Sequence, residues 1–311
     1  MHKSRPKWLP IEGSPEIVDG TITFIGVKKP AAKKSTKTDE EEDAPKANPM
    51  ATVKADTYFE SGDITGEVRL STTEVKIFFR LGAVGSDRTS VGFGVNGHTY
   101  GLSSLIENKL TDISHVGADT SIPANQWLRF RIRVRGSKIE FFVEDIQVLH
   151  GVSKFPRAQL VVKFVGEGTA ELKNVAVEAI RPQAFVVMQF TNEYTALFKE
   201  VIEPVCTDFG YQVVRGDNVY TNGLIIEDIV RSIRECSVVI ADITPNNANV
   251  YYELGFAHGI GKPAILLSDR SRDKLPFDIS GFRLLFYDNT IGGKKAVEEA
   301  LQKHLEAIRE A

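Results

Sequence analysis

The first half of the chain alternates between apolar and polar residues. Period-two alternation is clearest in four segments, at residues 67–71, 75–80, 128–134 and 138–143. This pattern is typical of antiparallel strands that bury one face and expose the other to water. Turn residues such as Gly136 separate the segments. Many short strands joined by turns predict an antiparallel β-sandwich over residues 1–180.

Beyond Pro182 the pattern changes to short apolar runs separated by amphipathic segments. The runs do not alternate and are rich in β-branched residues, as in buried parallel strands; they lie at 184–189, 211–214, 237–241, 263–268 and 283–287. Segments with helical spacing lie between and after them, at 192–209, 223–236, 249–259 and 294–309. Strand and helix alternate, which predicts an α/β doubly wound five-stranded parallel sheet over residues 181–311.

One segment, at residues 28–50, fits neither pattern. Its first part is basic, its second part is acidic, and it has almost no apolar residues. Such a segment cannot bury enough surface to offset the entropy lost on ordering. We therefore expect a disordered charged loop, and we favour a solvated insertion over a docking tail.

Length, net charge and cysteine content indicate the number of domains, the kinds of partner and the location to expect. A chain of 311 residues suits two domains, and its net charge of −3 gives no electrostatic reason to bind nucleic acid or an anionic membrane. We find no apolar stretch of membrane-spanning length and no apolar leader, so the expected location is the cytoplasm. Cys206 and Cys236 lie in apolar helical patterns and are interpreted as reduced core residues.

Two apparent motifs in the first half are set aside. Residues 92–97 spell G-x-G-x-x-G, but no helix follows to receive a phosphate. His98, His115 and His150 show no metal-ligand spacing, so the sequence predicts no metal site.

The strongest functional signal is the passage from Asp242, at the end of an apolar run, into the helix that follows. Asn249 is interpreted as the N-cap of that helix, which places Glu253 in its first turn, where the helix dipole favours a carboxylate. Gly255 suggests close approach of a ligand or a strand. Loops of this kind bind ligands in open α/β sheets.

Other loops should meet this one at the same edge of the sheet. We expect a shared crevice with Glu253 and Asp242 as catalytic residues and with six substrate-binding residues: Gln189, Phe190, Arg215, Asp217, Asn249 and Tyr252. Carboxylates and amides can hold ribose hydroxyls, and a carboxylate can stabilise positive charge at an anomeric carbon. Arg215 could meet a phosphate. For His258 we favour a packing or subunit-contact role over acid catalysis.

The second half resembles the bacterial TIR-like domains related to nucleoside 2-deoxyribosyltransferases. The resemblance is carried by residues 185–190, 215–218, 223–229, 241–244 and 249–258, the last with its Tyr-Tyr-Glu-Leu-Gly block. It implies a flavodoxin- or TIR-like fold and a carboxylate, Glu253, acting at an N-glycosidic carbon. It implies NAD or another nucleotide as substrate and no cofactor. Gly216 and Asn218 depart from the pattern of the relatives, as does a long third loop.

The first half is similar to the concanavalin-type and laminin-G-like jelly rolls, which implies a sensor or interaction module. We therefore expect a nucleotide N-glycosidase, an antiviral-defence or toxin effector controlled by its N-terminal domain or by a regulatory protein partner. A homo-oligomer is expected, with no membrane or nucleic-acid partner. Two alternatives stay open: a nucleotide-sensing or assembly module without turnover, and a lectin-like binding protein centred on the sandwich. Glu253 could also serve the helix dipole alone, with Tyr251 and Tyr252 in the core.

Overall fold

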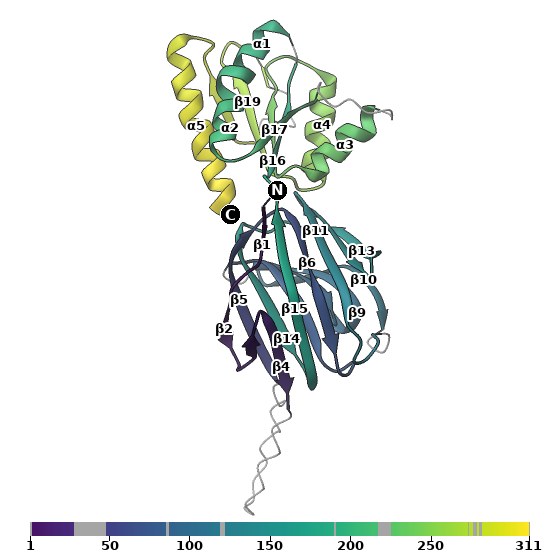
Figure 1. The fold of residues 1–311 in the computed structure, drawn as a ribbon. Helices are drawn as coiled ribbons and strands as arrows, with labels where there is room; N and C mark the ends of the chain where they lie inside the picture. The colour runs from purple at the N-terminus through teal and green to yellow at the C-terminus, as the bar shows by residue number, and fades with distance from the viewer. Residues whose placement is uncertain are drawn as a thin grey trace, which may run out of the picture. The chain divides into compact units, whose positions relative to one another are not determined.

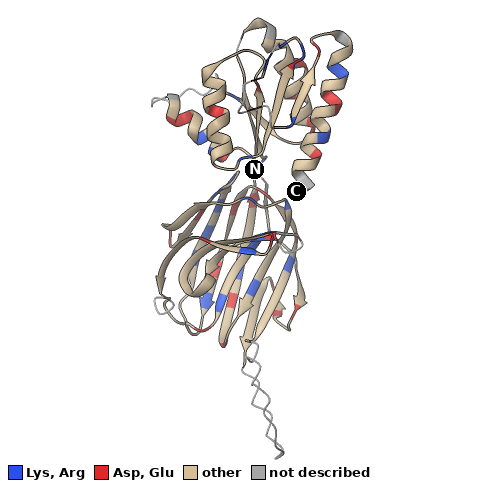
Figure 2. Cartoon of the chain, turned by 180° about the vertical axis from the view of Figure 1, so that it is seen from behind, with Lys and Arg blue, Asp and Glu red and all other residues tan. Residues whose placement is uncertain are grey.

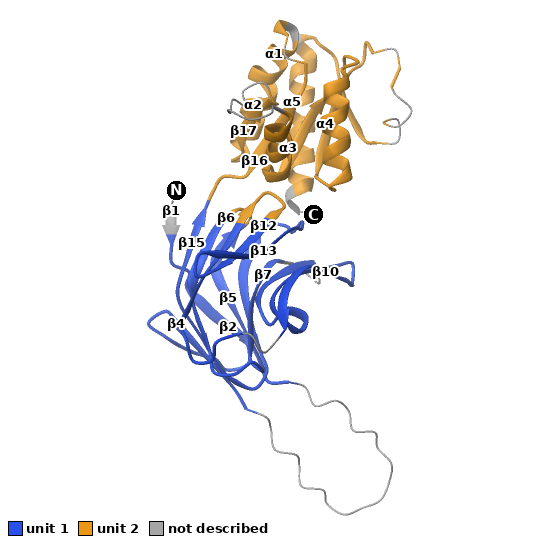
Figure 3. Ribbon diagram, turned by 90° about the vertical axis from the view of Figure 1, so that its right-hand side faces the viewer, with its two compact units in different colours: residues 1–59, 63–133, 139–179 blue, residues 60–62, 134–138, 180–311 orange. Residues whose placement is uncertain are grey.

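A computed structural model describes residues 2–27, 48–84, 87–118, 122–189, 191–216, 225–272, 274–275, 279 and 282–310. The chain divides into two compact units (Figure 3). Unit 1 comprises Met1–Phe59, Asp63–Arg133 and Ile139–Ala179; unit 2 comprises Glu60–Gly62, Val134–Lys138 and Ile180–Ala311. Most of the predicted charged loop, residues 28–47, lies outside the described residues.

Unit 1 is built from two antiparallel sheets (Figure 1). One has eight strands in the order β13-β12-β11-β6-β15-β4-β3, with β1 paired to β15, and the other has seven in the order β10-β9-β8-β7-β14-β5-β2. The predicted sandwich is therefore confirmed. The strands are β1 (His2–Ser4), β2 (Trp8–Glu12), β3 (Glu16–Val18), β4 (Thr21–Gly26), β5 (Met50–Phe59), β6 (Gly62–Leu70), β7 (Lys76–Val84), β8 (Asp87–Phe93), β9 (His98–Ile106), β10 (Lys109–Ala118), β11 (Leu128–Arg135), β12 (Lys138–Val143), β13 (Ile146–Val152), β14 (Ala158–Val165) and β15 (Gly168–Ala179).

The core of unit 1 follows from the alternation in its strands. Buried and half-buried residues alternate without a break along β6. Aromatic side chains from the two sheets meet between them: the rings of Phe24 and Phe164 lie 5.7 Å apart, and those of Phe93 and Phe141 lie 5.4 Å apart. Rings at these separations attract each other and fill the space between the sheets.

The arginines of β11 alternate with buried residues along the strand, so they lie on the face of the sheet away from the core. Charged residues recur among uncharged ones along the strands of unit 1 (Figure 2). Arg129 donates two hydrogen bonds to Glu144, with N–O distances of 3.1 and 2.9 Å. The guanidinium of Arg131 lies 4.4 Å from the ring centre of Phe142. The strand face predicted to be solvated therefore carries ion pairs and cation–π contacts.

The G-x-G-x-x-G spelling falls on a tight turn. Gly94 and Gly97 have positive φ angles of 77° and 83°, which a side chain would disfavour. The 3₁₀ helix η1 (Val95–Gly97), which follows Gly94 and ends at Gly97, leads directly into β9. These glycines allow the chain to turn, and they are not followed by a phosphate-binding helix, as the sequence indicated.

Unit 2 contains a five-stranded parallel sheet in the order β17-β16-β18-β19-β20. Its strands are β16 (Gln183–Val187), β17 (Gln212–Arg215), β18 (Val238–Asp242), β19 (Ala264–Asp269) and β20 (Leu284–Tyr287). Its helices are α1 (Asn192–Leu197), the π-helical turn η3 (Phe198–Ile202), α2 (Glu203–Asp208), α3 (Ile225–Glu235), α4 (Ala248–Gly259) and α5 (Ile291–Glu310). One apolar cluster joins the sheet to α1, η3, α2 and α5, and another joins it to α3 and α4.

The fold class expected from the sequence needs correction. Antiparallel sandwich sheets make up most of the described structure, and the parallel strands form only a small sheet. The doubly wound class of the flavodoxin or TIR kind, which was expected for residues 181–311 beside the sandwich, is therefore not assigned. Apolar, β-branched runs predicted the parallel strands correctly. Such runs show only that both faces of a strand are buried, and this does not determine the fold class of the chain.

The predicted helix at residues 192–209 is interrupted by the π-helical turn η3. Pro204 lies at the start of α2, where its missing N–H removes a donor to the preceding turn. Proline and a π-helical turn are both known causes of a break in a regular helix. The interruption falls beside the cavity described below.

Both cysteines are buried and unpaired, as predicted. Burial raises the pKa of the Cys206 thiol to about 12 and that of the Cys236 thiol to about 11. Separately, the described part of the chain has no helix long and apolar enough to cross a membrane.

Candidate functional site

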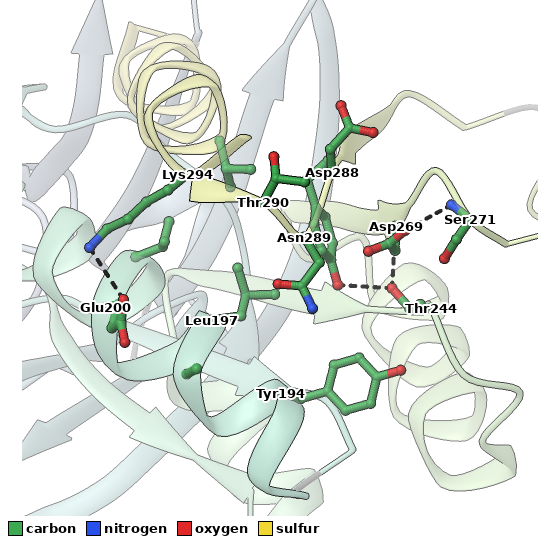
Figure 4. Close-up of a pocket in the computed structure, with 14 residues that line it drawn as sticks. Tyr194, Leu197, Glu200, Thr244, Asp269, Ser271, Asp288, Asn289, Thr290 and Lys294 are labelled. Carbon is green, nitrogen blue, oxygen red and sulfur yellow. Dashed lines mark hydrogen bonds and ion pairs between the residues drawn. The ribbon is translucent and has the colours of Figure 1, made fainter. Parts of the chain in front are cut away.

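A cavity of about 590 Å³ lies in unit 2 at the carboxyl ends of β18, β19 and β20 (Figure 4). Side chains from α1, η3 and the start of α5 form its other walls. It is lined by Tyr194, Ala196, Leu197, Glu200, Val201, Thr244, Asp269, Ser271, Tyr287, Asp288, Asn289, Thr290, Lys294 and Val297. Its volume is in the usual range for small-molecule sites, and this edge of an open α/β sheet is where such sites occur.

One wall is held by a hydrogen-bond network around the buried carboxylate of Asp242. Its Oδ1 accepts from the backbone N–H of Thr244 at 2.8 Å and from the Thr244 hydroxyl at 2.5 Å, while its Oδ2 accepts from Tyr287 Oη at 2.7 Å. Thr244 Oγ1 in turn accepts from the backbone N–H of Asp269 at 2.9 Å. The network joins the ends of three neighbouring strands.

The carboxyl group of Asp242 is fully buried, and burial raises its pKa, against the opposing effect of the hydrogen bonds from Thr244 and Tyr287. All of these bonds are internal, so Asp242 fixes the residues that line the cavity and does not itself line it. It is a positioning residue.

The charged groups at the cavity are mostly negative. Glu200, Asp269 and Asp288 are carboxylates, and Lys294 is the only cation in the lining of this cavity. Lys294 Nζ lies 3.4 Å from Glu200, and Arg270 from outside the lining lies 3.4 Å from Asp288. Asp269 Oδ1 accepts a hydrogen bond from the backbone N–H of Ser271, while the carboxylate remains part of the cavity surface (Figure 4).

Neutral hydrogen-bonding groups supply the rest of the polar lining. The Asn289 amide and the Tyr194 ring lie around the same opening as Thr244 and Asp269 (Figure 4). An amide offers both donors and acceptors, and a tyrosine offers an apolar ring face together with a hydroxyl. The cavity therefore presents closely spaced acceptors, donors and one aromatic face.

Glu253, the predicted catalytic carboxylate, is not among the lining residues. The N-cap of α4 is Asn247, two residues before the predicted cap, so Glu253 lies in the middle of the helix and outside its first turn. Burial raises its pKa to about 7. The dipole argument for an ionised Glu253 was therefore wrong. Open space surrounds the position of a Cβ on Gly255, so close packing does not explain that glycine.

The other described residues of the predicted site lie outside this cavity. The guanidinium of Arg215 stacks over the Phe198 ring at 4.8 Å, Tyr252 is 55% exposed, and Asn249 is exposed. Gln189 is half-buried, and neither it nor any of these lines the cavity. Phe190 and Asp217 lie outside the described residues. His258 stacks on Phe282 with ring centres 4.3 Å apart, in agreement with the packing role favoured for it.

Sequence reasoning missed most of the residues that do line the cavity. Asp288, Asn289 and Thr290 form a polar run directly after the last apolar strand. Because parallel strands end at one edge, this run could have been placed beside Thr244 and Asp269. Tyr194 gave no such signal, because it fitted the apolar stripe of its helix.

Comparisons with known proteins bear on the fold. No protein-family model and no curated protein sequence matches the chain. Solved structures that it matches include a carbohydrate-binding module, CBM66, from Bacillus subtilis, at 10% identity and a TM-score of 0.41, covering 55% of this chain and 95% of that one. A β-1,3-1,4-glucanase (lichenase) from a mouse hindgut metagenome matches at 12% identity and a TM-score of 0.39, covering 58% and 96%. Bacillus licheniformis β-glucanase matches at 9% and 0.38, covering 57% and 94%.

The expected activity lacks support on two counts: the predicted catalytic residue Glu253 does not line the cavity, and the resemblance on which the activity rested is not found among these matches. The matched structures are a carbohydrate-binding module and glycoside hydrolases, not TIR-like or deoxyribosyltransferase proteins. We therefore withdraw the expected nucleotide N-glycosidase activity, whether as NAD cleavage or as nucleoside transfer. We also withdraw the expected role as a defence effector. The low identities and TM-scores leave the ligand of this chain to be argued from its own residues.

Proposed function

We propose that this chain is a lectin-like binding protein whose unit 2 holds a small, neutral, polyhydroxylated ligand of the sugar class without turning it over. The observation that carries the proposal is the polar lining of the cavity at the carboxyl ends of β18, β19 and β20. Sugar hydroxyls both donate and accept, and they match a wall of carboxylate, amide and hydroxyl groups. The Tyr194 ring offers a face for the apolar C–H side of a sugar ring.

The charge at the cavity favours a neutral ligand over an anionic one. In the lining, three carboxylates and one ammonium group leave a formal excess of two negative charges, and Arg270, which pairs with Asp288 from outside the lining, reduces this excess to one. The N-terminus of α5, which starts beside the cavity, adds only about half a positive charge. A phosphate would bring about 1.5 to 2 further negative charges and would be repelled.

Binding of matched neutral and charged sugars tests this proposal. Ribose and glucose are titrated into the protein beside ribose 5-phosphate and glucose 6-phosphate, and binding is followed by ligand-detected NMR. We expect a neutral sugar to bind and its phosphate ester to bind more weakly. Tighter binding of the phosphate esters would contradict the charge argument, and no binding by any neutral mono- or disaccharide in a broad panel would end the proposal.

Two pairs of variants locate the site. Asp269→Asn and Tyr194→Ala should each weaken sugar binding, the first by about ten- to a hundredfold because it removes a charged acceptor. The matched controls are Glu253→Gln and Tyr252→Ala, which make the same kinds of change, carboxylate to amide and tyrosine to alanine, on α4, away from the cavity lining. Equal losses in the controls would show that the sugar binds elsewhere.

We further propose a cytoplasmic location. Supporting it are the buried, unpaired thiols of Cys206 and Cys236, which suit a reducing compartment. Recovery of the chain from an oxidising compartment on cell fractionation would contradict this.

A further inference from the structure

Three potential metal ligands meet on the seven-stranded sheet of unit 1. Asp112 Oδ2 lies 3.3 Å from His98 Nε2 and 3.1 Å from His115 Nδ1. The two imidazole rings are stacked, with centres 3.9 Å apart and planes 12° apart. One ligand atom from each residue lies within 4.8 Å of the other two.

The chain brings these residues together through an irregularity in β10. In a regular strand, residues three apart point to opposite faces, so Asp112 and His115 would not meet. The pairing with β9 shifts between Asp112 and Ser114, where β10 carries one extra residue. A β-bulge of this kind re-aims the side chains that flank it. Here it turns Asp112 and His115 to the same side, and His98 reaches them from the first position of β9.

The spacing matches the requirements of a metal ion. Ligand atoms held about 2.0–2.1 Å from a tetrahedral ion lie about 3.3 Å from one another. The two nitrogen–oxygen distances at Asp112 are already close to this value. Binding one ion also requires the His98 and His115 rings to turn out of their stacked arrangement, because the lone pair of each nitrogen lies in the plane of its ring.

The ligand types select the class of ion. Two imidazoles and one carboxylate suit Zn²⁺ and its first-row neighbours, whereas Mg²⁺ and Ca²⁺ prefer sites made wholly of oxygen. The side chains of His98, Asp112 and His115 are 28%, 34% and 52% exposed, so an ion has access and water can complete its coordination.

We propose that His98, Asp112 and His115 form a binding site for a divalent transition-metal ion, Zn²⁺ in the first instance, with one coordination position open to water or a ligand. The site lies in unit 1 and is independent of the cavity in unit 2. It revises the expectation, drawn from sequence spacing, that the histidines of this region do not form a metal site. A hydrogen-bonded His–Asp–His network without an ion is the competing explanation.

Calorimetric titration of Zn²⁺ into the full chain, stripped of metal and free of any histidine tag, separates the two explanations. We expect one ion per chain, with affinity reduced at least about tenfold by Asp112→Asn and by His115→Ala. The control is His150→Ala, which removes an exposed histidine of β13 that hydrogen-bonds to the nearby Gln147 at 3.4 Å. It should bind Zn²⁺ like the unchanged protein.

The visible absorption of the Co²⁺-loaded protein gives a second readout, because tetrahedral nitrogen–oxygen coordination produces bands that the hydrated ion lacks. The proposal is overturned if the unchanged protein binds no Zn²⁺, if Asp112→Asn and His115→Ala bind as it does, or if Mg²⁺ competes equally. Thermal melting without metal checks that each variant is folded. His115 lies on an exposed strand, so its replacement should leave the melting temperature unchanged.

Discussion

Two carboxyl groups of unit 2 that attracted attention in the sequence have different surroundings. Asp242 is surrounded by internal hydrogen-bond donors, whereas no hydrogen bond or ion pair of Glu253 is seen among the described residues. The first carboxylate supports the cavity wall, and the second is a half-buried acid whose ionisation works against the fold.

Glu253 should make stability depend on pH. Its pKa rises from 4.5 to about 7 on folding, so between these values the native state binds more protons than the unfolded state. The free energy of unfolding therefore falls as pH rises from about 4.5 to about 7. Glu253→Gln should remove this fall and melt at a higher temperature than the unchanged protein at pH 8, with a smaller difference at pH 4. Melting curves across this range check it, and identical pH profiles would contradict it.

Removing the Tyr287 hydroxyl should destabilise unit 2. Tyr287→Phe leaves Asp242 Oδ2 without its donor, which should cost about 1–3 kcal/mol. Because the lost bond favours the ionised carboxylate, the cost should be larger at pH 8 than at pH 4. Urea unfolding at both pH values measures it. Tyr252→Phe, at an exposed tyrosine, is the control and should be neutral; an equal cost for both would refute the role of the network.

At the scale of elements, the N-cap of α4 differs from the prediction: the sequence indicated Asn249, and the structure has Asn247. Asn247 accepts hydrogen bonds from the backbone N–H groups of Asn249 at 3.0 Å and Val250 at 3.5 Å. Asn247→Ala should therefore lower the free energy of unfolding by about 1 kcal/mol. Asn249→Ala, at the cap predicted from the sequence, should have little effect. A larger loss of stability for Asn249→Ala than for Asn247→Ala in urea unfolding would instead identify Asn249 as the N-cap.

Element types were largely readable from the hydrophobic pattern. Alternation located β11 and β12 closely, and unbroken apolar runs located β16 and β18, because burial on one or two faces leaves a direct trace in the sequence. Helix ends were less accurate, since Asn247 and Asn249 lie two residues apart and the sequence does not decide which of them caps α4.

The candidate site was much less predictable. Charged residues at strand ends were identified in general, but which of them share a cavity depends on side-chain packing. Glu253 was chosen because of its expected place in the first turn of a helix and because of the resemblance, while Asp288 and Asn289 were overlooked. The pairing of His98 with Asp112 and His115 depends on a bulge, which is set by strand register and leaves no periodic signal.

At the scale of the whole molecule, apolar side chains on an edge strand favour self-association. Leu9 and Ile11 on β2 are 66% and 54% exposed, and β2 lies at the edge of the seven-stranded sheet. Exposed apolar edge strands tend to pair with other chains. We expect a homo-oligomer that Leu9→Lys and Ile11→Lys together weaken. Light scattering checks this, with Lys109→Ala on the opposite edge strand β10 as control; a monomeric unchanged protein would contradict it.

The central claim is that a neutral sugar occupies the cavity of unit 2. Hydrogen–deuterium exchange of the full chain, with and without the tightest-binding sugar of the panel, tests it most directly. We predict slower exchange in peptides covering residues 191–201 and 287–297, which supply most of the cavity walls, and no change in β7, β8 and β14. Protection confined to the sandwich strands would place the ligand elsewhere and contradict the account.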